Sequence, residues 1–152
     1  MSRLTVWHDG DCPLCRREIA LMRRLDRRGA IDDRYRRGLA GIPGLTIVPT
    51  GDDVLANHGY FPILVEDAYP LDRDGLHRVL TAKGIGARRY FYPLIVDMPA
   101  YRGLPAAAVS VPNARRIADR ILCLPIFPDL TDDIVDGIVG TLRELVGDRK
   151  AA

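Results

Sequence analysis

The sequence Gly-Ile-Gly-Ala-Arg-Arg-Tyr-Phe-Tyr-Pro occupies residues 84–93 and joins two adjacent arginines to an aromatic run. Aromatic side chains favour extended structure, so a strand is expected here, and Pro93 should end it because proline cannot donate to a central ladder. Arginines at a strand end can bind phosphate or carboxylate oxygens through forked hydrogen bonds. Arg88 and Arg89 are therefore the first candidates for contact with a small anion. A solvated basic pair at a sheet edge is the alternative.

The residues before this stretch predict a helix over 71–83. Leu76, Val79 and Leu80 recur at helical spacing with polar residues between them. Gly84 follows as the residue type that most often ends a helix in the left-handed conformation. A helix should therefore lead directly into the arginine-bearing segment.

Size and charge limit the class of protein. The chain has 152 residues, 47% hydrophobic residues and a formal net charge of +2. This length suits one domain with a real core, and so small a charge does not favour nucleic acid or an anionic membrane as the main partner. No apolar run reaches the length of a membrane span, and the first residues lack the features of a signal peptide. We therefore expect a cytoplasmic protein with no nucleic-acid or membrane partner.

The N-terminal part predicts a β-turn-α unit that carries a Cys-x-x-Cys motif. Residues 4–7 form a short apolar run, 9–11 form a turn, and a helix should run from Pro13 through residue 28, with Gly29 as its stop. Cys12 would be the N-cap and Cys15 would lie in the first turn. The positive end of the helix dipole stabilises a thiolate there and can lower a thiol pKa to roughly 7. Half of a zinc site and two incidental thiols are the alternatives, but no second Cys or His pair has zinc-ligand spacing.

The rest of the chain alternates short strands with helices. We expect a helix over 32–39, strands over 46–48 and 57–65, a long connection over 97–111, a helix over 113–120 and a core strand over 121–127. Pro62 suggests an edge strand or a bulge, and Cys123 should be a buried structural residue. The last helix begins after Thr131 as its N-cap, and its expected inward side chains are Ile134, Val135, Ile138, Leu142, Leu145 and Val146.

Several links between these elements are too short for parallel crossovers. The expected fold class is therefore α+β, with a small mixed or antiparallel sheet and helices packed mainly on one face.

Residues 7–15, Trp-His-Asp-Gly-Asp-Cys-Pro-Leu-Cys, resemble the opening of the DCC family of thiol-disulfide oxidoreductases. The resemblance implies that residues 1–31 are an incomplete thioredoxin-like β-α opening. It also implies redox catalysis in which Cys12 is the nucleophile and Cys15 the resolving thiol.

Residues 34–146 resemble the C-terminal domain of the PLP-dependent nucleotide-sugar aminotransferases, the DegT/DnrJ/StrS family. The matching motifs are residues 57–62, 84–93, 99–101 and 118–130, in the same order as in that family. The resemblance implies that residues 32–150 form a small domain that helps to hold a nucleotide sugar. It implies substrate contacts at Arg88, Arg89, Tyr90 and Tyr92, with Asn57 and Tyr60 as weaker candidates.

Transamination needs a lysine that holds PLP as a Schiff base, and the chain has only Lys83 and Lys150. Neither lies in the family's lysine motif, so we expect no cofactor in this chain and no catalysis by it alone. A homodimer or a large-domain partner is then expected, and the two resemblances together suggest a fusion, a remnant or an artificial splice. The alternatives are a thiol-disulfide oxidoreductase and a non-catalytic interaction domain.

Overall fold

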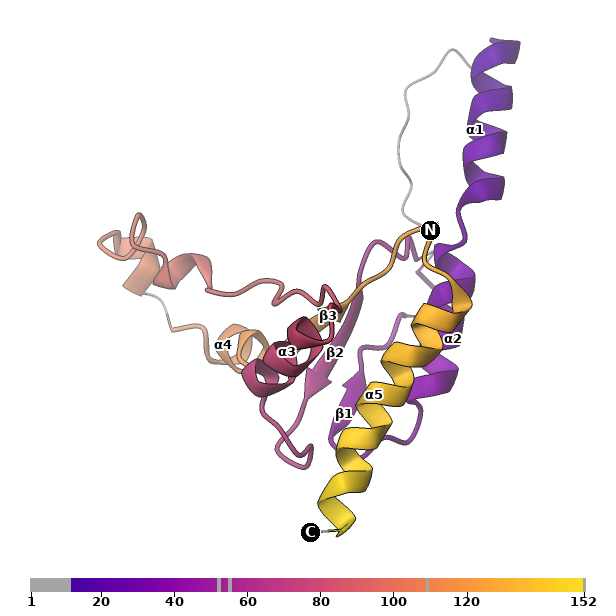
Figure 1. Ribbon diagram of the computed structural model, residues 1–152. Coiled ribbons are helices and arrows are strands. Elements are labelled where there is room, and N and C mark those ends of the chain that lie inside the picture. The colour runs from indigo at the N-terminus through magenta and orange to yellow at the C-terminus, as the bar shows by residue number, and fades with distance from the viewer. Residues whose placement is uncertain (1–11, 52, 55, 109, 152) are drawn as a thin grey trace.

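The computed structural model describes residues 12–151 except 52, 55 and 109 (Figure 1). The strand expected over 4–7 and the turn at 9–11 lie outside this part. In chain order the elements are α1 (Pro13–Leu25), α2 (Arg28–Leu39), β1 (Leu45–Ile47), β2 (Phe61–Val65), α3 (Arg73–Ala82), the 3-10 helices η1 (Ile95–Asp97) and η2 (Pro105–Ala108), α4 (Pro112–Ala118), β3 (Ile121–Leu124) and α5 (Asp132–Ala151). None of the helices described is both long and apolar enough to cross a bilayer.

The described strands form one antiparallel sheet in the order β1-β2-β3. Leu45 pairs with Val65 on one side of β2, and Ile63 pairs with Leu122 on the other. This confirms the α+β class with a small antiparallel sheet.

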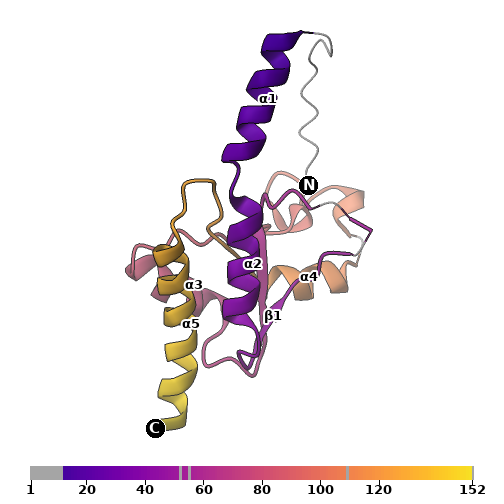
Figure 2. The same cartoon turned by 90° about the vertical axis from the view of Figure 1, so that its right-hand side faces the viewer.

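The core lies on one face of this sheet. Phe61, Ile63 and Val65 alternate with half-buried residues along β2, so their side chains share a face. Helices α2 and α5 lie side by side in both ribbon views (Figures 1 and 2) and contact each other directly. Together with α3 they supply most of the other fully buried side chains of this core, which include Ile31, Tyr35, Leu39, Leu76, Leu80, Val135, Ile138 and Leu142.

The prediction that Pro62 marks an edge strand or a bulge is wrong, because β2 is the central strand. The amide that proline lacks would face the β1 side of β2, just beyond the point where β1 ends at Ile47. There the Val48 amide donates to the Pro62 carbonyl at 3.4 Å, and the Val48 carbonyl accepts from Arg36 Nη1, also at 3.4 Å. An arginine from α2 thus takes the place of the missing donor.

The expected stop at Gly29 is also wrong. Helix α1 ends at Leu25, the backbone is extended at Asp26, and Gly29 lies in the first turn of α2. Arg28 folds back on Asp26 with hydrogen bonds of 2.9 Å from Nε and 2.6 Å from Nη2. Figures 1 and 2 both show α1 standing away from the body, and its side chains Leu14, Leu21 and Met22 are exposed.

The helix predicted over 71–83 is confirmed as α3. Asp72 caps its start by accepting a 2.6 Å hydrogen bond from the Gly75 amide, and Gly84 follows its end with φ of +76°. In α5, Val135, Ile138 and Leu142 are buried as expected. Ile134 was expected inward but is 51% exposed, because it lies one position off the buried stripe.

Candidate functional site

The arginine-bearing segment is a turn rather than the strand that we expected. Arg88 makes one antiparallel bridge to Cys123, with hydrogen bonds of 2.9 and 2.7 Å. Beyond it the Tyr90 amide bonds to the Arg88 carbonyl and the Tyr92 amide to the Arg89 carbonyl, at 3.2 and 3.0 Å. These local bonds satisfy the backbone groups that a ladder would have used, so the sheet ends here.

A groove of about 370 Å³ lies beside this turn. We call it the aromatic groove, and its lining residues are Gly59, Tyr60, Gly86, Arg88, Tyr90, Cys123, Leu124, Pro125, Ile126 and Phe127. Tyr60 meets Tyr90 edge-on with 5.4 Å between ring centroids, and Tyr90 stacks on Phe91 at 5.1 Å. The Phe91 side chain is 71% exposed. The groove therefore combines aromatic faces with one guanidinium.

Arg88 is the cation of this groove. Its Nη1 donates to Tyr90 Oη at 2.5 Å, and this hydrogen bond raises the pKa of Arg88 further. No carboxylate in the described part of the chain forms an ion pair with Arg88, whose side chain is exposed. Its remaining N–H groups are thus available to an anion.

Arg89 is engaged elsewhere. Its Nη1 donates to Asp74 Oδ1 at 3.1 Å. The Tyr92 ring contacts both Arg89 and the buried Arg73, with 5.6 and 4.5 Å from ring centroid to Cζ. Arg73 Nε lies 2.8 Å from the same Asp74 oxygen without a hydrogen-bonding angle, and Arg73 Nη1 bonds to the Ala118 carbonyl at 3.0 Å. The structure therefore separates the two arginines that the sequence placed together.

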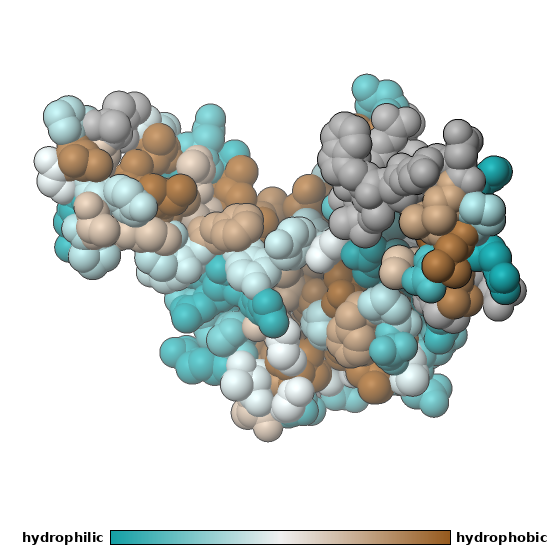
Figure 3. Space-filling model, turned by 90° about the horizontal axis from the view of Figure 1, so that it is seen from above, coloured by the Kyte–Doolittle hydropathy of each residue, from teal (hydrophilic) through white to brown (hydrophobic). Residues whose placement is uncertain are grey.

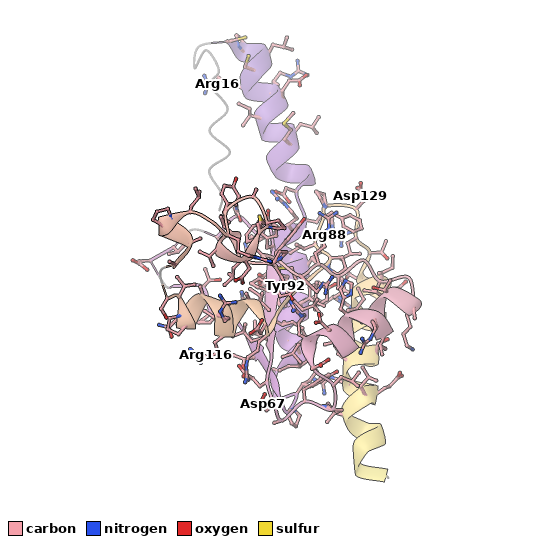
Figure 4. The ribbon with its side chains drawn as sticks, turned by 90° about the vertical axis from the view of Figure 1, so that its left-hand side faces the viewer. Arg16, Asp67, Arg88, Tyr92, Arg116 and Asp129 are labelled. Atoms are coloured by element: carbon pink, nitrogen blue, oxygen red, sulfur yellow. The ribbon has the colours of Figure 1, made fainter. Side chains whose placement is uncertain are left out.

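Burial acts to raise the pKa of Asp74, but the hydrogen bond from Arg89 and the charges of Arg73 and Arg89 lower it overall. The carboxylate thus stays ionised and holds both guanidiniums. Figure 4 shows Arg88 and Tyr92 near the middle of the body.

Cys123 lines the groove and not the main core. It pairs with Pro62 on the sheet face opposite Leu122 and Leu124, yet it is only 6% exposed. Burial raises the pKa of its thiol. The expected buried position is confirmed, but the strand is shorter than predicted, since β3 ends at Leu124.

Of the weaker candidates, only Tyr60 reaches the aromatic groove. Asn57 Oδ1 accepts a 2.8 Å hydrogen bond from the Gly59 amide, which shapes the turn before Tyr60. Asn57 itself lines a neighbouring hollow with Asp32, Arg36 and His58. The expected strand over 57–65 begins only at Phe61.

Cys12 and Cys15 lie at the start of α1, away from the groove; Figure 4 labels the adjacent Arg16 far from Arg88. The pKa of Cys12 is lowered by hydrogen bonds from the Cys15 amide and thiol. The pKa of Cys15 is raised because its thiol donates to Cys12. The two thiols are therefore inequivalent, with Cys12 the better nucleophile.

Sequence reasoning missed Asp32, Arg36, His58, Arg73 and Asp74. A sequence signal existed only for Asp32 and Arg36, which are spaced i, i+4 on a helix. Arg73 and Asp74 contact each other, but each of the others also has a partner on another segment: Asp32 for His58, the Ala118 carbonyl for Arg73 and Arg89 for Asp74.

Comparison with known proteins identifies the class. The model of the DegT/DnrJ/EryC1/StrS aminotransferase family matches residues 16–143, so the chain belongs to that family. It is 46% identical over 112 residues to dTDP-4-amino-4,6-dideoxy-D-glucose transaminase of Escherichia coli, and this match covers 73% of the chain and 30% of the relative. The chain thus spans under a third of that relative's length. The resemblance to the aminotransferases is confirmed.

Solved structures agree with this assignment. The crystal structure of DesI in the presence of its TDP-sugar product matches with a TM-score of 0.71 and 30% identity, over 83% of this chain and 34% of that one. The structure of S. venezuelae DesV in complex with a ketimine intermediate matches with a TM-score of 0.70 and 31% identity, over 79% and 31% of the two chains. The DCC resemblance stays a prediction. So does a domain boundary after residue 31, a position that lies within α2.

The family is PLP-dependent, but the residues described here do not fit that cofactor. Lys83 caps the exposed end of α3 and lines no groove described above, and the Lys150 side chain lies outside the described part. Within that part, no group of three His, Cys, Asp or Glu side chains could hold a metal ion.

Proposed function

We propose that the chain provides the nucleotide-sugar-binding side of a sugar aminotransferase and does not transfer the amino group by itself. The observation that carries this proposal is the position of Arg88, an exposed guanidinium beside aromatic rings, while its neighbour Arg89 is held by Asp74. A guanidinium binds two phosphate oxygens at once, and aromatic faces pack against a base or a sugar ring. The names of the relatives support a dTDP-linked sugar as the ligand.

The residues that line the groove would have different roles in binding the ligand. Arg88 binds the diphosphate through the N–H groups that Tyr90 leaves open, and Tyr90 fixes the guanidinium by its hydrogen bond. Ile126 and Phe127 supply the apolar wall against which the ring of the ligand excludes water.

Titration of the isolated chain with dTDP-glucose, followed by NMR, tests this proposal. We expect a millimolar Kd, because an open groove gives up about 4 kcal/mol relative to a micromolar site. Arg88→Ala should weaken binding roughly tenfold, as expected for losing a hydrogen bond to a charged group. Arg116→Ala is the matched control, since Arg116 is exposed on α4 and lines neither hollow described above. Equal affinity of wild type and Arg88→Ala would show that this arginine is only solvated.

Cys123 offers an independent readout. Because it lines the groove, dTDP-glucose should slow its alkylation in a Cys12→Ser, Cys15→Ser background. An unchanged rate at saturating ligand would place the ligand elsewhere.

We also propose a protein partner, either a second copy or a chain that carries the lysine-bearing domain. Exposed apolar side chains support a docking surface. They come directly after the groove-lining Arg88 and Tyr90 in the sequence and are Phe91, Tyr92, Ile95, Tyr101 and Leu104. Figure 3 shows apolar residues gathered on the lobe at its left, which η1 and η2 form. A mass measurement in solution tests self-association. If the protein is monomeric and binds no nucleotide sugar, a docking role through this surface becomes the better hypothesis.

A redox role is the second candidate function, because the Cys12 and Cys15 thiols are paired and inequivalent. Cys12 as thiolate would attack a disulfide and release one thiolate, and Cys15 would then displace the second and close the Cys12–Cys15 disulfide. The two cysteines lose two electrons and two protons, and the substrate disulfide becomes two thiols. Failure of glutathione disulfide to form this bond would remove the hypothesis.

A further inference from the structure

Arg89 and Tyr92 belong to the turn beside the aromatic groove, but neither side chain lines that groove. The resemblance to the aminotransferases implies that both contact the ligand. Arg88 and Tyr90 do line the groove, and they hydrogen bond to each other. The side chains at positions 89 and 92 therefore need a different explanation.

The backbone of this turn is attached to the sheet at its start. The amide and carbonyl of Arg88 bond to Cys123 of β3 at 2.9 and 2.7 Å, and the Tyr90 amide also bonds to the Cys123 thiol. Further along, the Tyr92 amide bonds only to the Arg89 carbonyl, inside the turn itself. Within the described part of the chain, no backbone bond ties Tyr92 to the sheet. Side chains must therefore hold this end of the turn.

The start of helix α3 supplies these side-chain contacts. Arg89 Nη1 donates to Asp74 Oδ1 at 3.1 Å. Arg73, the residue before Asp74, has its Cζ 4.5 Å from the centre of the Tyr92 ring, and Arg89 Cζ lies 5.6 Å from the same centre. A guanidinium over the face of an aromatic ring is attracted by the ring's quadrupole. Two adjacent residues of α3 thus hold both Arg89 and Tyr92.

The two α3 residues differ in how firmly they are themselves held. Arg73 is only 4% exposed, and its Nη1 donates to the buried Ala118 carbonyl at 3.0 Å, so the guanidinium cannot move without losing that bond. The Asp74 side chain is 44% exposed. Its pair with Arg89 therefore has the strength of a surface ion pair, and a substitution can remove it without opening the core.

We propose that Arg89 and Tyr92 are positioning residues that do not contact the ligand. Asp74 and Arg73 hold them against α3, and this fixes the turn. The Tyr90 hydroxyl, which lies within that turn, is thereby placed to accept the 2.5 Å hydrogen bond from Arg88 that orients its guanidinium. A carboxylate that does not line the groove thus determines how well the groove binds an anion. The effect on ligand binding rests on the proposed function.

Titration of the full chain with dTDP-glucose separates the two roles of Arg89 by the sign of one effect. Asp74→Asn keeps the shape of the side chain but removes its charge, so it releases the Arg89 guanidinium. If Arg89 positions the turn, this variant should bind roughly threefold to fivefold more weakly, as expected for losing a half-exposed ion pair. If Arg89 contacts the ligand, its release should leave the affinity unchanged or raise it. Either of these two results would overturn the proposal.

Asp67→Asn is the matched control. Asp67 is paired with Arg120 at 3.0 Å, and Figure 4 labels it away from Arg88 and Tyr92. Arg120 keeps Glu66 as its other partner. The control removes the same charge from the chain and should change the affinity by less than about twofold. An equal loss in both variants would show that the effect of Asp74→Asn is not local to the turn, and would refute the positioning role.

Tyr92 gives a second test, because the two guanidiniums contact its ring and not its hydroxyl. Tyr92→Phe should therefore keep the affinity of wild type, whereas Tyr92→Leu should weaken binding as Asp74→Asn does. Weaker binding by Tyr92→Phe would indicate that the hydroxyl contacts the ligand. Unchanged binding by Tyr92→Leu would show that the ring does not position the turn. Each of these results contradicts the proposal.

Nuclear Overhauser contacts between the Tyr60 and Tyr90 rings test the positioning role without a ligand. These rings meet edge-on with 5.4 Å between centroids. In Asp74→Asn the contacts should weaken while amide protection in β2 and β3 stays as in wild type, which distinguishes a displaced turn from a general loss of stability. Unchanged ring contacts would overturn the proposal. If Asp74→Asn does not fold, the two Tyr92 variants decide the question. If dTDP-glucose does not bind wild type, the proposed function fails, and the ring contacts still decide whether α3 positions the turn.

Discussion

Gly44 is the position at which adding a single methyl group should lower the free energy of unfolding most. It lies between α2 and β1 with φ of +77°, in the left-handed region. A Cβ built on it would lie 2.0 Å from the Tyr69 amide nitrogen and 2.5 Å from the Ala68 carbonyl carbon. Both are backbone atoms, so the clash cannot be relieved by rotating a side chain.

The cost of Gly44→Ala has two parts. The left-handed conformation costs an alanine about 1–2 kcal/mol. Moving the backbone at Tyr69 also disturbs two 2.8 Å hydrogen bonds, from the Glu66 amide to the Gly44 carbonyl and from Tyr69 Oη to the Leu142 carbonyl. At about 1 kcal/mol each, these bring the expected loss of unfolding free energy to about 3–4 kcal/mol. That is a large share of the 5–15 kcal/mol typical of a domain.

Gly84→Ala is the matched control for backbone conformation. Gly84 has φ of +76°, but a Cβ there meets nothing within 4 Å, so only the cost of about 1–2 kcal/mol should appear. Urea unfolding followed by far-UV circular dichroism measures both variants. Equal destabilisation by the two substitutions would refute the steric argument and leave only the conformational cost.

Four further outcomes follow from the geometry. Burial raises the pKa of Tyr69, and also that of Tyr35, above the value of an unfolded tyrosine, so above about pH 10 each should cost about 1.4 kcal/mol of stability per pH unit. Tyr69→Phe should therefore lower the slope of alkaline unfolding curves by about half. Iodoacetamide should label Cys12 at lower pH than Cys15, and Cys15→Ala, which removes the side-chain donor, should raise the pKa measured for Cys12; identical pH profiles of the two thiols would count against their hydrogen bond. Cys123 should be labelled slowly until urea unfolds the chain, since it is buried and its thiol pKa is raised. With PLP equimolar to the protein, borohydride should trap no stoichiometric adduct that disappears in Lys83→Ala, because this lysine stands exposed at a helix end and lines neither hollow described above that could hold the cofactor.

Local rules account for the part of the fold that the sequence predicted. The cap at Asp72, the apolar spacing of α3 and the left-handed Gly84 all act within a few residues, so their effect can be read along the chain. The same holds for most of the apolar stripe of α5. The motifs at residues 84–93 and 118–130 likewise pointed to the aminotransferase family, because they depend on residue order alone.

The failures share a physical cause. Pro62 can stand in the central strand because Arg36 of α2 bonds to the carbonyl that would have accepted the proline amide. The aromatic run at 90–92 is not a strand because its rings pack on Tyr60 and Arg73 instead of on a neighbouring strand. Both outcomes depend on partners at least 12 residues away, which propensity cannot specify.

By itself, then, the sequence determined the residue types of the site: two arginines beside aromatic rings, and a Cys-x-x-Cys at a helix start. Only the tertiary structure decided which arginine is available, because Asp74 on α3 holds Arg89 while Arg88 bonds to Tyr90 and faces the groove. It also joined Asp32 to His58, which are 26 positions apart, and turned Cys123 from the core toward the groove. The packing of helices and strands decides which charged groups pair with each other and what a strand residue faces. Packing brings together residues that no local pattern connects.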